Sequence, residues 1–161
     1  MRPMLMRTYV RVHYSCALCT SSSRNGFEVP HGLEHGRFRL RKLTIDDVVK
    51  DFEAINERVD HEGLAQPPFV GTIALNLVDL GWHQKEFELR RSFAYTVVAP
   101  DESDVLGCVY RYPSETHDAR VRMWVRREAW EDGLDPIVEA ALREWLEREW
   151  PFETVDWGER A

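Results

Sequence analysis

The sequence of 161 residues contains no apolar run of about 18 residues, the length that a membrane-crossing helix requires. We therefore expect no membrane span. Lysine is also scarce, with 3 lysines beside 18 arginines, and 28 acidic residues give a net charge of −7. An acidic chain lacks the broad basic footprint that nucleic-acid binding needs, so we expect no nucleic-acid partner.

The sequence has only three cysteines, and no convincing secretion signal precedes them. This cysteine usage favours a reducing compartment, so we expect a cytoplasmic protein. Pro30 and Gly32 interrupt the helix that a zinc finger would need, and we expect no bound metal. A metal site has to be considered because Cys16, Cys19, His31 and His35 have a spacing close to that of a zinc finger.

Residues 1–27 differ in composition from the rest of the chain. They contain four arginines and several serines, and no acid precedes Glu28. A transit-like presequence has this composition, and so does an extension from a start codon placed too far upstream. We expect residues 1–27 to form an N-terminal arm or extension, and residues 28–161 to form a single domain.

Three strand patterns follow one another in the second half of the sequence, at residues 92–99, 105–112 and 118–126. The third alternates most cleanly, with valines and a methionine on one face and arginines on the other. Cys108 falls inside the second pattern, where we expect a buried small side chain. A shorter strand is expected at residues 38–43 and another just before Trp157.

Helical periodicity predicts three helices. The first follows Thr44, with Asp47 in capping-box position, and the second runs from about residue 72 to residue 91. The third has Asp135 as the expected N-cap and ends at Pro151. The predicted core positions of the second helix are Ile73, Leu77, Leu80, Phe87 and Leu89. The element order β-α-α-β-β-β-α-β predicts an α/β (α+β-like) fold with at least one parallel pair.

This order resembles that of the GNAT acetyltransferase superfamily, and in particular a poorly characterised small bacterial and archaeal group within it. The resemblance spans about residues 27–157, and the sequence ends after the fifth strand, without the closing helix and two strands of the family. The stretches that carry it are residues 27–30, 38–41, 79–87, 92–96, 105–110 and 150–152. It implies a GNAT-like mixed sheet and an acetyl-CoA-dependent N-acetyltransferase.

The resemblance places the diphosphate of acetyl-CoA after the fourth strand, where the family carries the pattern Arg/Gln-x-x-Gly-x-Gly/Ala. The matching segment here, residues 126–133, contains one glycine, and Asp132 and Asp135 would oppose a phosphate. The implied cofactor-binding residues are Trp124, Val125, Arg126, Arg127 and Gly133. Three arginines of the third strand pattern suit an anionic ligand, but an exposed face paired with acidic neighbours explains them better.

Amine acetylation needs a base for the ammonium and a donor for the leaving thiolate. His83 and Glu86 lie one helical turn apart and could act as the base, and Tyr110 could be the donor. A solvated helix face would also explain His83 and Glu86, and a core aromatic position would explain Tyr110.

We therefore expect transfer of an acetyl group from acetyl-CoA to a small-molecule or peptide amine. The alternative is a non-catalytic GNAT-like module that binds a small molecule or a protein partner. A gap between the last two parallel strands would favour the enzyme, and a weakened phosphate loop favours the module. The chain could also form a homodimer.

Overall fold

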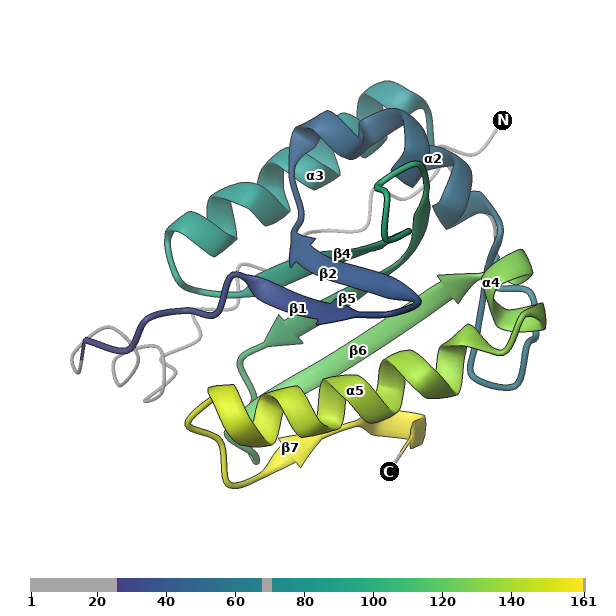
Figure 1. Cartoon of the computed structure of the whole chain (residues 1–161). Coiled ribbons are helices and arrows are strands. Elements are labelled where there is room, and N and C mark those ends of the chain that lie inside the picture. The colour runs from purple at the N-terminus through teal and green to yellow at the C-terminus, as the bar shows by residue number, and fades with distance from the viewer. Residues whose placement is uncertain (1–25, 68–70, 161) are drawn as a thin grey trace, which may run out of the picture.

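The computed structural model describes residues 26–67 and 71–160. It contains a seven-stranded sheet, and Figure 1 shows this sheet between two layers of helices. The sheet order is β1-β2-β4-β5-β6-β3, and β7 also pairs with β6. The strands are β1 (Gly32–His35), β2 (Phe38–Lys42), β3 (Arg58–Val59), β4 (Phe93–Val98), β5 (Val105–Tyr112), β6 (Ala119–Arg126) and β7 (Val155–Asp156). The helices are η1 (Ile45–Asp47), α2 (Val48–Asn56), α3 (Ile73–Glu88), α4 (Arg127–Glu131), α5 (Leu134–Glu149) and η2 (Gly158–Arg160).

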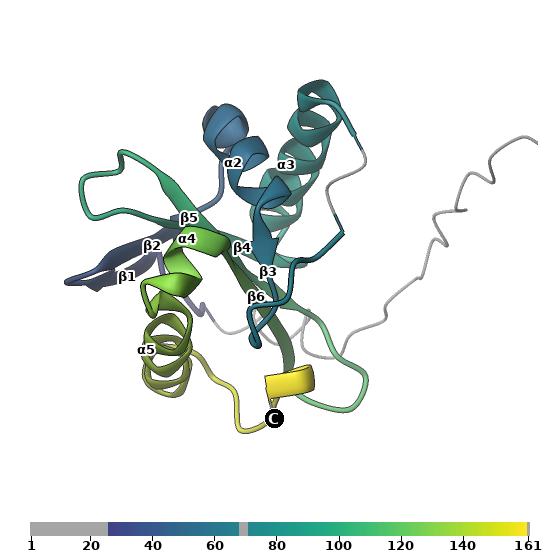
Figure 2. The same cartoon turned by 90° about the vertical axis from the view of Figure 1, so that its right-hand side faces the viewer.

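The two faces of the sheet carry different helices. Figure 2 shows α2 and α3 side by side over one face, and α5 against the other. The larger core lies under α5, where Val138, Leu142 and Trp145 pack against alternate residues of β4, β5 and β6. A smaller core lies under α2 and α3, around Leu80 and Cys108. The expected burial of Cys108 is confirmed, because its side chain is fully inaccessible.

The antiparallel β4-β5-β6 meander agrees with the three strand patterns. Alternation in β6 places Ala119, Val121, Met123 and Val125 in the core, as the period-2 pattern predicts. Gly107 lies where β5 and β6 approach closely, since a Cβ there would come within 2.1 Å of the Trp124 carbonyl oxygen. The parallel pair of the predicted β-α-β ending is β6 with β7, joined through α5.

Several predicted helix details are wrong. α2 begins at Val48, and Thr44 makes no side-chain capping bond, because the 3-10 turn η1 intervenes. α5 begins at Leu134 after Gly133, so Asp135 lies in its first turn instead of capping it. The predicted start of the second helix at about residue 72 is confirmed, since Thr72 is the N-cap of α3 and its side chain accepts a hydrogen bond from the Leu75 N–H group.

The predicted core positions of α3 are only partly correct. Leu80 is buried and Phe87 packs against the larger core, but Ile73, Leu77 and Leu89 are each more than 40% exposed. Asn76 and His83 instead share the inner face with Leu80. The sequence analysis therefore missed the two polar side chains that complete this inner face.

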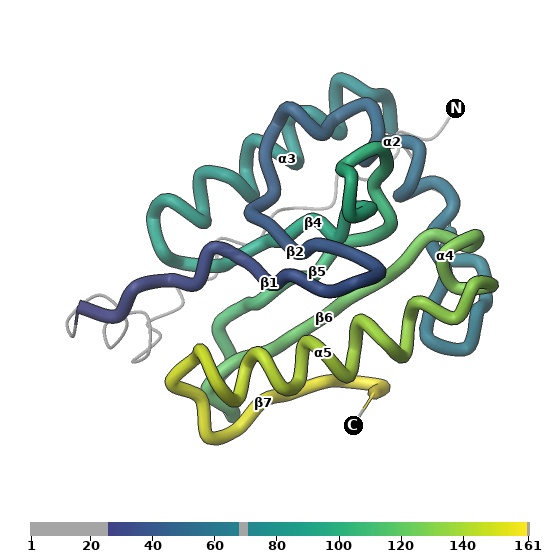
Figure 3. Tube along the Cα trace, viewed as in Figure 1, coloured from purple at the N-terminus to yellow at the C-terminus, as the bar shows by residue number. Residues whose placement is uncertain are grey.

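Short elements at the edges of the sheet were not predicted: β1, β3 and α4. β1 forms a hairpin with β2, and the chain before it packs through Phe27 onto Trp150, with ring centroids 5.6 Å apart. The tube in Figure 3 allows the path from β1 to β7 to be followed. The expected cysteine arm lies largely outside the described residues. None of the described helices is long and apolar enough to cross a membrane.

Candidate functional site

An opening in the sheet lies along one edge of β6. β7 pairs there in parallel at Ala119 and Arg120, and β3 pairs antiparallel at Val125 and Arg126. Within the described chain, residues 121–124 have no strand partner on this edge. The last two parallel strands therefore part after two residues, and β6 leaves about 13 Å of strand edge open between β7 and β3.

Arg122 lies at the β7 end of this opening. Its Nη1 donates to the carbonyl oxygens of Val121 (2.6 Å) and Asp156 (3.0 Å). The Asp156 carboxylate accepts from the Gly158 N–H group and from Arg120, and these bonds lower the pKa of Asp156 to about 2. The Arg120 and Arg122 side chains are thus paired with an acidic neighbour, which was one of the two interpretations of the arginine face.

β3 closes the other end of the opening, and the chain runs on from β6 through α4 to the N-terminus of α5. Gly133 precedes this helix in the left-handed conformation (φ 72°), and a Cβ at this position would meet no atom within 4 Å. No side chain caps the helix, so its first N–H groups, those of Leu134 and Asp135, point out of the helix end without an intrahelical partner. The positive end of the helix dipole lies at the same place.

The segment expected to be a phosphate loop is mostly helix. Residues 127–131 form α4, and only Asp132 and Gly133 separate it from α5. A cavity of about 560 Å³ borders this corner, and its charged lining comprises Arg37, Arg126, Asp104, Glu128, Glu131 and Asp132. Four carboxylates against two guanidinium groups make the lining acidic.

Four of the five predicted cofactor-binding residues lie at or near this corner, in different surroundings. Arg126 is already paired, with Glu57 (2.7 Å) and Asp104 (2.7 Å). Arg127 is exposed and makes no side-chain hydrogen bond or ion pair with the described residues. Val125 is fully buried beneath α5, and Gly133 has the backbone conformation described above. Trp124 lies on the opposite face, where its indole donates to the Tyr110 hydroxyl (3.3 Å).

His83 and Tyr110 meet on the α3 side of the sheet. Their ring centroids are 5.0 Å apart, and Tyr110 is the direct cross-strand partner of Arg122, a residue of the opening. His83 is only 6% exposed, so it does not lie on a solvated helix face. Burial lowers the pKa of His83 although Asp79 and Glu86 oppose this, and burial raises the pKa of Tyr110 well above its ordinary value. At neutral pH the imidazole is therefore neutral and the phenol keeps its proton.

Glu86 belongs to the same end of α3 but is less closely involved. Its carboxylate lies 3.4 Å from Arg91, and its charge acts on His83 without a direct bond. Asp79 comes nearer, with an oxygen 3.7 Å from the His83 Nε2 atom. The structure thus brings His83 and Tyr110 together and leaves Glu86 at their margin.

A buried polar group beside this pair was missed by the sequence analysis. Asp51 of α2 is 2% exposed, accepts from the Asn76 side chain (2.9 Å) and lies 3.6 Å from the Cys108 sulfur. Burial raises the pKa of the Asp51 carboxyl above its ordinary value. Helical spacing held the signal, because Asp51 shares a face with Val48 and Ile55 of the predicted apolar stripe.

Solved acetyltransferases have this architecture. The chain is similar to a provisionally assigned ribosomal-protein-serine acetyltransferase from Vibrio cholerae, with TM-score 0.59 and 14% identity over 73% of this chain and 67% of that one. It is also similar to the ribosomal-protein-S5-alanine acetyltransferase from Vibrio fischeri, with TM-score 0.56 and 16% identity over 74% and 67%. The chain has the GNAT acetyltransferase fold.

A third structure of this fold is microcin C7 self-immunity acetyltransferase MccE, whose crystals contain acetyl-CoA and AMP. Here the TM-score is 0.56 and the identity 12%, over 74% of this chain and 68% of that one. The chain thus spans about two thirds of the length of these GNAT-fold relatives. The sequence matches no protein-family model and no curated protein.

Proposed function

We propose that this GNAT-fold protein transfers an acetyl group from acetyl-CoA to a small-molecule or peptide amine. The observation that carries the proposal is the opening along β6 between β7 and β3, where residues 121–124 have no strand partner on that edge among the described residues. Three similar solved proteins are acetyltransferases by name, and one of them holds acetyl-CoA. A gap beside the last two parallel strands favours the enzyme over a binding module.

The main chain of this site fits acetyl-CoA better than its side chains do. The edge of residues 121–124 can hydrogen bond to the amide groups of a pantetheine arm, as it would to a strand. The uncapped N–H groups of Leu134 and Asp135 suit a diphosphate, and the open space at Gly133 allows close approach. Arg127, the first residue of α4, is an exposed cation that makes no ion pair with the described residues, and it lines the neighbouring cavity with Glu128 and Glu131, which oppose it.

Acetyl-CoA supplies an acetyl group that is already activated as a thioester. The chain supplies the proton chemistry: the neutral His83 ring can take a proton from an acceptor ammonium, and the Tyr110 hydroxyl can donate one. Trp124 orients that hydroxyl by donating to its oxygen. Glu86 acts on His83 through its charge.

A second function, a non-catalytic binding module, is favoured by one observation. Carboxylates outnumber guanidinium groups around the α4–α5 corner, and Arg126 is neutralised by Glu57 and Asp104. An anion would therefore gain little from side-chain charge. The two functions differ in one measurable property, the binding of acetyl-CoA.

Titration calorimetry of the whole chain with acetyl-CoA tests the proposal. We expect saturable binding that Arg127→Ala weakens roughly tenfold, about 1.4 kcal/mol, because the variant loses this exposed cation. Arg148→Ala is the matched control, since Arg148 is an exposed arginine far along α5. Glu131→Gln should strengthen binding severalfold, whereas Glu147→Gln should not.

Release of free thiol from acetyl-CoA in the presence of a panel of primary amines would then identify the acceptor. Absence of heat at millimolar acetyl-CoA, in the wild type and in Glu131→Gln alike, would contradict the acetyltransferase and leave the binding module. Binding that Arg127→Ala and Arg148→Ala weaken equally would place the cofactor elsewhere.

A further inference from the structure

The outer surface of the η1–α2–α3 layer is unusually apolar. Nine large apolar side chains of the described residues are more than 40% exposed, and eight of them lie on this layer. They are Ile45, Val49, Ile73, Leu75, Leu77, Val78, Trp82 and Leu89, which we call the helical apolar face. Leu64 is the ninth and lies in the loop after β3. Figure 2 shows that α2 and α3 form the outermost layer on their side of the sheet.

The centre of the helical apolar face is a stripe on α3. Leu75, Val78 and Trp82 follow one another at intervals of three and four residues, and Leu89 continues the line one heptad later. They lie opposite the inner face that Leu80 helps to form. This is a two-sided helix: polar Asn76 and His83 are buried inward, and apolar side chains point outward. Such a pattern is unfavourable for an isolated surface helix and typical of a helix with partners on both sides.

The size of the face points to a protein partner. Ile73 lies one heptad before Leu80, toward the inner side of α3, and the other seven side chains, each about half exposed, present on the order of 600 Å². The largest patch on a typical monomer covers roughly 300–600 Å², and a standard-size interface buries roughly 800 Å² on each partner. A net charge of −7 disfavours an anionic membrane surface as the occupant.

We propose that the helical apolar face is the interface of a symmetric homodimer, with the same face of a second copy as its occupant. A two-fold interface requires one surface that is complementary to itself. α3 offers a bulky Trp82 beside Gly81, where a Cβ would meet only the Ile45 side chain, at 3.8 Å. Glycine therefore leaves room for an apolar side chain of the second copy. Exposed Lys85 and Glu88 at the margin provide both signs of charge for a polar rim.

Dimerisation would also support the polar groups on the inner side of these helices. The helices α2 and α3 carry these buried groups, Asp51, Asn76 and His83, and their outer surfaces are not covered by any other described element. Packing two copies outer side to outer side would fix α3 from both faces. The inference stands on the exposed surface and does not depend on the proposed acetyl transfer.

Light scattering of the full chain during size-exclusion chromatography, over a range of concentrations, tests the dimer. We expect twice the chain mass of 18.9 kDa. The double change Val78→Glu with Trp82→Glu should return it to 18.9 kDa, with at least a hundredfold weaker association. Leu64→Glu is the matched control, because Leu64 is 61% exposed but lies off the face, and it should leave the dimer intact.

All changed positions are exposed, so we expect each variant to fold, and its thermal unfolding midpoint checks this. A full chain that stays monomeric at 100 µM would overturn the proposal. Hydroxyl-radical footprinting would then identify the real occupant: shielding of Trp82 in the monomer points to residues 1–25, and strong labelling points to a different protein. A dimer that survives the double change would place the interface elsewhere.

Discussion

The environment of His83 suits a residue that accepts a proton. The His83 imidazole is 6% exposed and makes a tilted contact with the Tyr110 ring. Its buried Nδ1 atom has no partner among the described residues, so the side chain contributes little to stability. Its lowered pKa keeps it neutral at pH 7. A neutral ring with an unsatisfied nitrogen is suited to accept a proton, and the Tyr110 side of that ring leads toward the open edge of β6.

We expect His83→Gln to lower kcat for acetyl transfer by roughly a hundredfold, with little change in KM for acetyl-CoA. The rate should fall as the pH drops through the folded-state pKa of His83, which burial holds below 6.5, because protonation removes the base. His117→Gln is the control, since His117 is exposed in the loop before β6. A variant that keeps its kcat, or keeps the acid limb of its pH profile, would exclude His83 as the base.

Sequence spacing predicted which residue types could meet, but not how buried they are. His83 and Tyr110 were named from chemistry and helical spacing, and the fold does bring them together. Asp51 was missed because a carboxylate on an apolar face looks like an exception until its partners, Asn76 and Cys108, are known. Those partners lie 25 and 57 positions away, a separation that no local pattern encodes.

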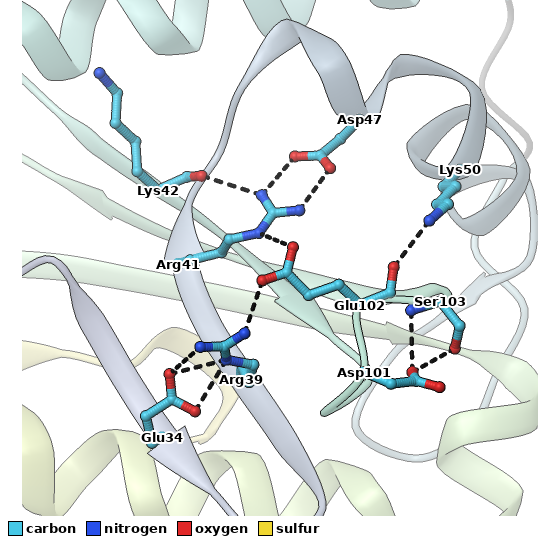
Figure 4. Close-up of polar contacts among 9 residues, drawn as sticks. All are labelled: Glu34, Arg39, Arg41, Lys42, Asp47, Lys50, Asp101, Glu102 and Ser103. Carbon is cyan, nitrogen blue, oxygen red and sulfur yellow. Dashed lines mark hydrogen bonds and ion pairs between the residues drawn. The ribbon is translucent and has the colours of Figure 1, made fainter.

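At the scale of elements, a chain of ion pairs joins β2 to η1 and to the β4–β5 turn. Figure 4 shows that both terminal nitrogens of Arg41, Nη1 and Nη2, donate to the Asp47 carboxylate (2.9 and 2.8 Å), while its Nε donates to Glu102 (3.1 Å). Glu102 adopts a positive φ of 58°, and its carbonyl oxygen also accepts from Lys50 (2.8 Å). These bonds hold a strained turn against the start of α2. They also explain why α2 starts three residues later than the capping-box pattern suggests.

We expect Arg41→Ala to lower the free energy of unfolding by about 1–3 kcal/mol, because Asp47, whose side chain is only 8% exposed, loses its bidentate partner. Arg39→Ala removes a neighbouring arginine whose side chain is 38% exposed, and it should cost under about 1 kcal/mol. Urea unfolding followed by circular dichroism measures both. Equal losses of unfolding free energy for the two variants would show that the Arg41–Asp47 pair stabilises the protein no more than the exposed pairs of Arg39 do.

Over the whole molecule, period-2 alternation in residues 92–126 and the helix after Gly133 were enough to predict the meander and the final parallel pair. α4 was not predictable in the same way. In the sequence, residues 127–131 resemble a degenerate phosphate loop. They become helical because β3 pairs with the end of β6 and the Glu57 carbonyl oxygen accepts a hydrogen bond from the Arg127 N–H group (2.9 Å). The core prediction for α3 missed Asn76 and His83, because buried polar side chains look like surface positions in sequence.

The C-terminal turn depends on one buried arginine. Arg160 is bound to both oxygens of Asp135 (2.8 and 2.7 Å) and to Glu139 (2.9 Å), and its side chain is 8% exposed. Arg143 adds a bond to the Arg160 carbonyl oxygen (2.6 Å) and lies 4.0 Å from the centre of the Trp157 ring. The turn that follows β7 is thereby tied to the first turns of α5, beside the N–H groups proposed to hold the diphosphate.

We expect Arg160→Ala to destabilise the protein by about 3–5 kcal/mol, because Asp135, 3% exposed, is left as an uncompensated charge. Adding Asp135→Asn should restore part of this loss, which a double-mutant cycle by urea unfolding would measure. Burial opposes ionisation of Glu139, but its bonds to Arg143 and Arg160 outweigh this and lower its pKa. That stabilisation is present at neutral pH and is lost as the pH falls through the lowered pKa, so Arg160→Ala should lose less stability on acidification than the wild type. Equal acid sensitivity of the two proteins would show that Glu139 takes its stabilisation from Arg143 alone.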